Sequence, residues 1–145
     1  MSKVITIDPG KIKCGLVLAE ISEQKVYKAI ILKSELIENY VRNLIKAEDI
    51  SQIIIGNGTT SREIREKLYF FKKEIITCQE KNTTYRAKAR YFELFPIIGL
   101  KFLIPREVFI LNKNLDAISA LIILEDFCKM KFTLDRNIDF KTWLK

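Results

Sequence analysis

The fold is decided by residues 4–17, which read Val4-Ile5-Thr6-Ile7-Asp8-Pro9-Gly10-Lys11-Ile12-Lys13-Cys14-Gly15-Leu16-Val17. An apolar run ends at Asp8, a Pro-Gly pair breaks it, and a second β-rich run starts at Cys14 and continues to Glu20. A third run covers residues 25–32. We expect these runs to be three strands in an antiparallel meander, with Asp8 at the end of the first.

Downstream, the spacing of apolar residues changes from that of a strand to that of a helix. The helical stripe consists of Leu36, Ile37, Tyr40, Val41, Leu44 and Ile45, and Ser34 is placed to cap it. A continuous apolar run at 52–55 then predicts a strand buried on both faces. It ends in Gly56-Asn57-Gly58, after which Thr60 and Glu63 form the capping-box pattern of a second helix.

The cycle of strand and helix repeats further along the chain. Residues 75–78 are expected to form a strand, and residues 84–94 a helix that Pro96 stops. Residues 95–113 are expected to be an ordered excursion, after which Asn114 caps a long apolar helix over 115–129.

Together these runs predict an α/β fold. Its five-stranded mixed sheet has three antiparallel strands followed by two parallel ones, and helices flank it. One domain is expected over residues 1–132, because a chain of 145 residues supports a single core, and the tail 133–145 has no assignment.

Composition limits the chemistry that this chain can perform. The formal charge is +7, and there is no histidine, which removes the commonest general base and the commonest transition-metal ligand. Residues 62–106 hold eleven Lys and Arg against five Glu, which favours a polyanionic partner, although lysine-rich surfaces are common. Cys14, Cys78 and Cys128 match no zinc-binding spacing and are expected to be buried thiols. The early charge and the lack of a long apolar run predict a cytoplasmic protein without a membrane span.

Three acidic residues stand where carboxylates could hold a divalent cation. Asp8 ends the first strand at the carboxyl edge of the sheet, although from spacing alone an Asp before Pro-Gly is more often a turn residue. Asp116 lies in the first turn of the last helix, where the helix dipole favours a carboxylate with or without a metal. Ser119 and Ala120 are small, which would let this helix approach the sheet and carry Asp116 toward Asp8. Glu80 follows the strand at 75–78 and could equally be a solvated surface residue.

Four segments, in this order, resemble RuvC-like Holliday-junction resolvases and their YqgF-type relatives. Residues 7–17 resemble the opening Asp-x-Gly hairpin, and residues 56–61 resemble the glycine turn after the fourth strand. Residues 80–87 are similar to the Glu-x-x-(Ser/Thr)-Thr segment of the YqgF branch, and residues 115–120 resemble its closing Asp-Ala helix.

The resemblance implies an RNase H-like fold and a metal-dependent endonuclease. In such an enzyme Asp8, Glu80 and Asp116 would be the catalytic carboxylates and would bind Mg²⁺ or Mn²⁺. The residues expected to contact nucleic acid are Lys11, Lys13, Asn57, Thr59, Arg86, Lys88 and Arg90. For Lys11 and Lys13 a solvated surface role stays open. The expected substrate is structured nucleic acid, either four-way junction DNA or precursor ribosomal RNA, and a homodimer would favour symmetric junction cleavage.

Departures from the family pattern leave alternatives open. Asn57 stands near the place of a resolvase glutamate, Ser119 stands where a further ligand is usual, and Lys13-Cys14 replaces an Arg-Ile pair. One alternative is therefore a catalytically weak or inactive RNase H-like protein that binds nucleic acid. An actin-like or sugar-kinase-like ATPase shares the Asp-x-Gly hairpin but needs a second lobe, for which this chain is too short.

Overall fold

The centre of the molecule is a mixed β-sheet that begins with the Asp8 strand. A computed structural model describes residues 2–79, 83–95, 115–138 and 143–144. The strands are β1 (Lys3–Asp8), β2 (Lys13–Glu20), β3 (Lys25–Lys33), β4 (Ile50–Gly56), β5 (Glu74–Cys78), β6 (Thr133–Leu134) and β7 (Trp143–Leu144). The helices are η1 (Ser34–Leu36, a 3₁₀ turn), α1 (Ile37–Ala47), α2 (Ser61–Lys67), α3 (Thr83–Leu94) and α5 (Asp116–Cys128).

The order of the strands across the sheet is β5-β4-β1-β2-β3-β6, and β7 also pairs with β3. β2 runs antiparallel to β1 and to β3, whereas β4 is parallel to β1 and β5 is parallel to β4. This arrangement confirms the expected antiparallel meander and the parallel pair. The expected count of five strands was too low for the described residues, because two-residue strands from the region 133–145 pair with the outer edge of β3.

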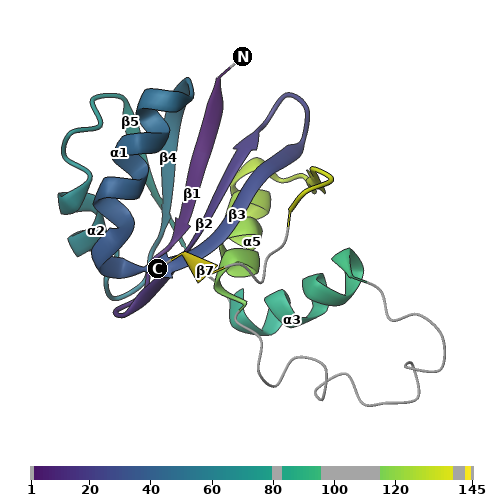
Figure 1. The fold of residues 1–145 in the computed structure, drawn as a ribbon. Coiled ribbons are helices and arrows are strands. Elements are labelled where there is room, and N and C mark those ends of the chain that lie inside the picture. The colour runs from purple at the N-terminus through teal and green to yellow at the C-terminus, as the bar shows by residue number, and fades with distance from the viewer. Residues whose placement is uncertain (1, 80–82, 96–114, 139–142, 145) are drawn as a thin grey trace.

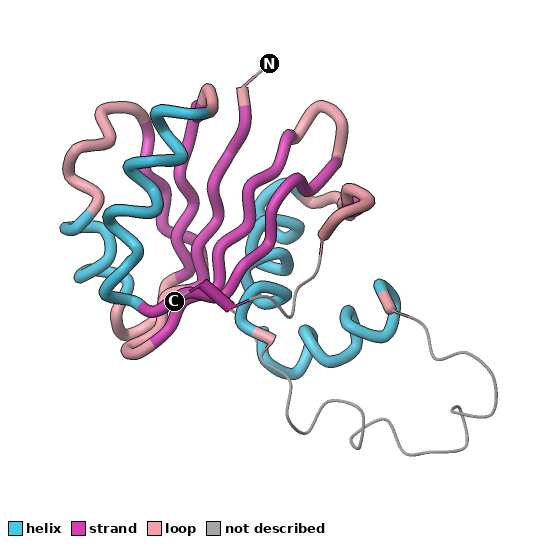
Figure 2. The backbone as a smooth tube through the Cα atoms, in the orientation of Figure 1, coloured by secondary structure: helices cyan, strands magenta, loops and turns pink. Residues whose placement is uncertain are grey.

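Helices cover both faces of the sheet (Figures 1 and 2). On one face α1 and α2 pack on Ile5, Ile7 and Ile53 and their neighbours, in a cluster that includes Val41 and Ile64. On the other face α5 packs against the sheet, and α3 packs on α5 through Ala87, Tyr91 and Phe92. Successive residues of β1 alternate between the two cores, because side chains of a strand point alternately to its two faces.

Of the two expected helix caps, Ser34 is wrong and Thr60 is correct in position but makes no capping hydrogen bond. The hydroxyl of Ser34 caps no helix, since the 3₁₀ turn begins at Ser34 itself and the hydroxyl bonds elsewhere. α2 does begin after Thr60 as expected, but Thr60 makes no capping hydrogen bond and its Oγ1 is buried without a partner among the described residues. The strand and helix positions are correct to within a few residues at each end.

Other expectations fall partly or wholly outside the described residues. These are Glu80, the stop at Pro96, the excursion at 95–113 apart from Phe95, and the cap at Asn114. The cysteines are free thiols, of which Cys14 is buried as expected while Cys78 and Cys128 are half-buried. Within the described ranges no helix combines the length and apolar character needed to cross a membrane.

Candidate active site

Asp8 lies on the face of the sheet that α5 covers. Val4 belongs to the core under α5, and Thr6 and Asp8 follow it at steps of two residues, so their side chains point to the same face. Asp8 is half-buried and stands directly opposite Gly15 in the antiparallel pairing of β1 with β2. Residues directly opposite each other share a face, so a side chain placed at position 15 would also point toward α5.

At Gly15 the backbone of α5 comes very close to the sheet. A Cβ atom on Gly15 would lie 1.9 Å from the carbonyl oxygen of Asp116 and 2.7 Å from the backbone nitrogen of Ala117. No side chain fits in that space, so the first turn of α5 rests directly on the backbone of β2. Since Gly15 is also the partner of Asp8, one contact brings the Asp116 end of α5 to the Asp8 end of β1.

The expected approach of the last helix to the sheet is thus confirmed. Ser119 and Ala120 are buried, as the small-residue argument requires. Gly15 was not expected to take part in this contact, although a glycine inside a strand run is a recognised sign that another backbone approaches closely.

Lys13 forms an ion pair with Asp116. Its Nζ lies 3.3 Å from Oδ2 of Asp116, and the two side chains are 36% and 31% exposed. Oδ2 itself is buried and accepts no hydrogen bond within the described part of the chain, so the contact is one of charge without hydrogen-bond geometry. Lys13 was expected to contact nucleic acid, and its contact with Asp116 was not expected from the sequence.

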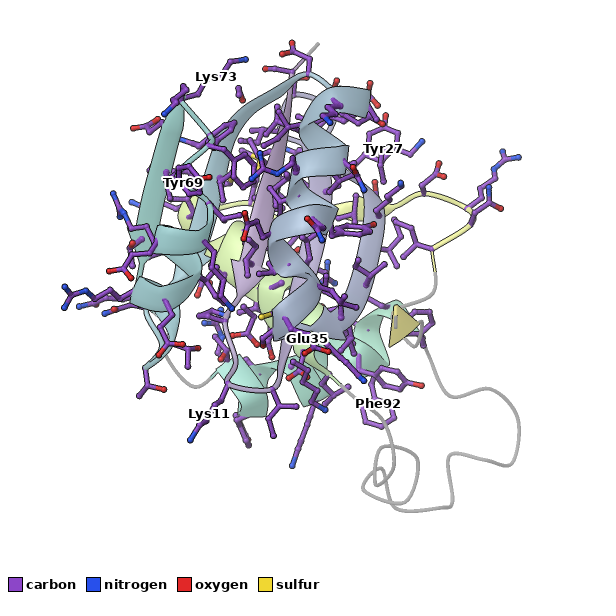
Figure 3. All side chains as sticks on the ribbon, turned by 60° about the vertical axis from the view of Figure 1, so that its left-hand side comes forward. Lys11, Tyr27, Glu35, Tyr69, Lys73 and Phe92 are labelled. Carbon is purple, nitrogen blue, oxygen red and sulfur yellow. The ribbon has the colours of Figure 1, made fainter. Side chains whose placement is uncertain are left out.

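Ser34 holds the turn that joins β1 to β2 through two hydrogen bonds. The Ser34 hydroxyl donates a 2.7 Å hydrogen bond to the carbonyl of Gly10, and the Ser34 amide donates a 2.8 Å bond to the carbonyl of Ile12. The thiol of Cys14 lies 3.2 Å from the same hydroxyl, and burial raises the pKa of this thiol. Ile12 and Lys11 are exposed, and Lys11 extends from the turn into solvent (Figure 3).

The carboxyl ends of β4 and β5 lie next to this site in the sheet. Gly56 pairs with Cys78, and the amide of Asn57 donates a 2.6 Å hydrogen bond to the Cys78 carbonyl. The side chains of Asn57 and Thr59 are exposed. Glu80, which follows Cys78 by two residues, lies outside the described residues, so its expected place beside Asp8 and Asp116 stays a prediction.

The three basic residues expected on α3 differ in what they contact. Arg86 makes two hydrogen bonds, of 2.7 and 2.6 Å, to the carboxylate of Asp126. Arg90 is only 11% exposed and bonds Glu125, Glu93 and the carbonyl of Phe132, so it ties α3 to α5. Lys88 is exposed.

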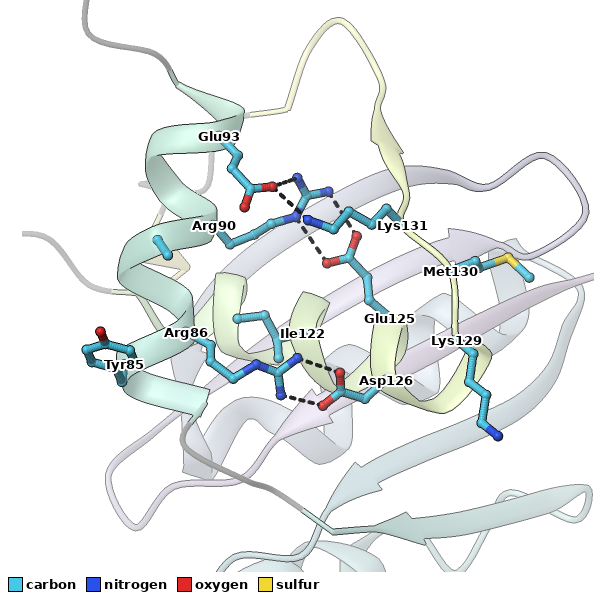
Figure 4. A pocket seen from close by; sticks show the side chains of 11 residues that line it. Tyr85, Arg86, Arg90, Glu93, Ile122, Glu125, Asp126, Lys129, Met130 and Lys131 are labelled. Carbon is cyan, nitrogen blue, oxygen red and sulfur yellow. Dashed lines mark hydrogen bonds and ion pairs between the residues drawn. The ribbon is translucent and has the colours of Figure 1, made fainter.

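A cavity of about 560 Å³ opens between α3 and the carboxyl-terminal half of α5 (Figure 4). Basic side chains on its wall, such as Arg86 and Arg90, face the acidic Glu93, Glu125 and Asp126 (Figure 4). Arg86 pairs with Asp126, Arg90 with Glu125 and Glu93, and Lys131 with Glu93. None of Asp8, Lys13 and Asp116 lines the cavity. The cavity is therefore separate from the site at Asp8.

Asp8 and Asp116 carry carboxylates, which are the ligands that a hard cation such as Mg²⁺ prefers. Of the four buried side-chain oxygens without a hydrogen bond among the described residues, two are Oγ1 of Thr6, on the Asp8 face of β1, and Oδ2 of Asp116. A carboxylate oxygen in that state gains from a cation, and Mg²⁺ prefers oxygen ligands, usually one or two carboxylates with several waters. Within the described residues no three His, Cys, Asp or Glu side chains form a metal-binding group. The described donor set is two carboxylates.

A comparison of this chain with models of protein families and with curated proteins gives no match.

Proposed function

We propose that this protein is a magnesium-dependent endonuclease that hydrolyses phosphodiesters of structured nucleic acid, built on an RNase H-like fold of the RuvC and YqgF kind. The observation that carries the proposal is the contact at Gly15, which brings Asp116 of α5 to the end of β1 where Asp8 lies. Three antiparallel strands followed by two parallel ones, as the resemblance implies, support the fold assignment.

Each group in the proposed site has a separate task. Asp8 and Asp116 hold the ion, with Glu80 as the third carboxylate, and bound Mg²⁺ supplies polarisation of the phosphate and activation of water. Lys11, exposed at the turn beside Asp8, binds a neighbouring phosphate and fixes the position of the strand to be cut. The absence of histidine is compatible with this chemistry, because the carboxylates and the ion replace a histidine base.

The test is cleavage of a synthetic four-way DNA junction and of a precursor-rRNA fragment, with Mg²⁺ or with EDTA. We expect magnesium-dependent cleavage of at least one substrate, and a loss of about a hundred-fold or more in Asp8→Asn and Asp116→Asn. Asp49→Asn is the matched control, because Asp49 is exposed and pairs only weakly, at 3.4 Å, with Lys73 at the surface. The proposal fails if the wild type cleaves neither substrate, or if Asp8→Asn cleaves as fast as Asp49→Asn.

A second candidate function is binding of nucleic acid without cleavage. The ion pair between Lys13 and Asp116 favours it, because an ammonium already satisfies part of the charge of Asp116. In that case the affinity for nucleic acid, measured by fluorescence anisotropy, would be the same in Mg²⁺ and in EDTA. Gel electrophoresis would show no cleavage product. The charge of +7 supports nucleic-acid binding in either case.

A further inference from the structure

We propose that Lys13 is a tethered competitor of the divalent cation, and that its displacement couples metal binding to nucleic-acid binding. This inference rests on the proposed function and names a residue that regulates the same site. Without the ion, the ammonium of Lys13 neutralises Asp116. When the ion binds, Lys13 leaves Asp116 and its charge becomes available to a phosphate.

The ammonium of Lys13 lies where it would compete with a bound cation. Nζ of Lys13 lies 3.3 Å from Oδ2 of Asp116, which is the buried oxygen without a hydrogen bond and therefore the one most in need of a cation. An Mg²⁺ ion bound to this oxygen would sit about 2.1 Å from it. Two positive charges so close to one oxygen repel each other strongly in a partly buried site, so the ion and the ammonium exclude each other.

The fold directs the side chain of Lys13 toward α5. Residues 13, 15 and 17 of β2 share the α5 face, and Val17 belongs to the core under α5. The backbone of Lys13 is fixed on two sides, by its pairing with Lys33 and by the tight turn in which a Cβ on Gly10 would lie 2.0 Å from the Lys13 carbonyl oxygen. The contact with Asp116 thus follows from the register of the sheet.

The contact between Lys13 and Asp116 can be reversed. The Lys13 side chain is 36% exposed, so its ammonium can move into solvent without crossing the core. It would then stand beside exposed Lys11, on the turn where the proposed site meets nucleic acid. Exposed ion pairs of this kind are weak, which makes displacement by a divalent ion feasible.

Coupling follows by thermodynamic linkage. A metal that releases Lys13 strengthens nucleic-acid binding, and nucleic acid that holds Lys13 strengthens metal binding by the same factor. Removal of the ammonium should therefore tighten metal binding by the free protein and abolish the coupling.

The experiment measures Mn²⁺ affinity by electron paramagnetic resonance for the wild type, Lys13→Met and Lys28→Met, with and without an uncleavable phosphorothioate junction. Lys28→Met removes the same charge from an exposed position of β3 that lies outside the proposed site. We expect Lys13→Met to bind Mn²⁺ about five-fold or more tightly than the wild type, and Lys28→Met to stay within about two-fold. The junction should tighten Mn²⁺ binding in the wild type and in Lys28→Met, but not in Lys13→Met.

The outcomes separate this inference from the proposed function. Equal Mn²⁺ affinities in the wild type and Lys13→Met would overturn the inference and leave the nuclease standing. Binding by Lys13→Met alone would support the competition and favour the metal-free function for the wild type. If no variant binds Mn²⁺, both proposals fail. Lys13→Gln repeats the test with a polar side chain, and thermal unfolding checks that each variant is folded.

Discussion

Gly15 is a single residue on which the whole site depends. Its Cα lies under the first turn of α5, and any side chain would enter the space of the Asp116 carbonyl. We predict that Gly15→Ala destabilises the protein by about 2 kcal/mol, because the helix end must lift from the sheet to admit a methyl group. Urea denaturation measures this loss, and Mn²⁺ affinity should fall with it because Asp116 moves with the helix.

Lys28→Ala is the control for this prediction, since Lys28 is exposed on β3 and its loss should change stability by less than about 0.5 kcal/mol. If Gly15→Ala unfolds at the same urea concentration as the wild type, then α5 is not held on β2 in the manner described, and the convergence of Asp8 with Asp116 loses its support.

Single residues also show where sequence-based prediction ends. The strands and helices were predictable because apolar spacing is a local property, as in residues 4–8 and 115–129. Ser34 was wrong as a cap, and Thr60 stands at the N-cap of α2 without a capping bond, because the partners of a hydroxyl depend on tertiary surroundings that a local pattern does not contain. Lys13 and Asp116 lie far apart in the sequence. Their contact depends on the register of β2 and on the position of α5 on the sheet, so no local pattern predicts it.

At the scale of elements, α3 and α5 are joined by two arginine–carboxylate pairs of unequal burial. Arg90 and Glu125 are 11% and 10% exposed, whereas Arg86 and Asp126 are 43% and 40% exposed. Glu125 also accepts a 2.8 Å hydrogen bond from the amide of Phe132. The inner pair therefore holds the two helices and the chain after α5 together, and the outer pair adds little.

We predict that Glu125→Gln costs about 3 kcal/mol, because it leaves the Arg90 guanidinium in the interior with only Glu93 as an acidic partner. Asp126→Asn, the matched change one residue away, should cost less than about 1 kcal/mol. Thermal unfolding of both variants tests this difference. Equal losses would show that burial does not distinguish the two pairs.

At the scale of the whole molecule, the charge of +7 should govern nucleic-acid binding. We predict that affinity for duplex or junction DNA falls by about a hundred-fold between 50 and 200 mM salt, as expected for about four phosphate contacts. Fluorescence anisotropy over a salt series gives the slope of log affinity against log salt concentration, and hence the number of phosphate contacts. Lys11→Met should reduce this number by about one. An affinity that does not change with salt would exclude phosphate contacts as the basis of binding.

The two short strands beyond α5 limit how copies of this protein can associate. β6 pairs with the start of β3 and β7 with its end, so both ends of that edge already have partners. At the opposite side of the sheet β5 pairs with β4 and, within the described residues, with no other strand. Growth of a β-sheet into a fibril requires two open edges on every copy. In the described residues β6 and β7 break the β3 side into short pieces, with residues 27–30 of β3 between them, so this side is a poor second edge and a second copy is expected to add at β5.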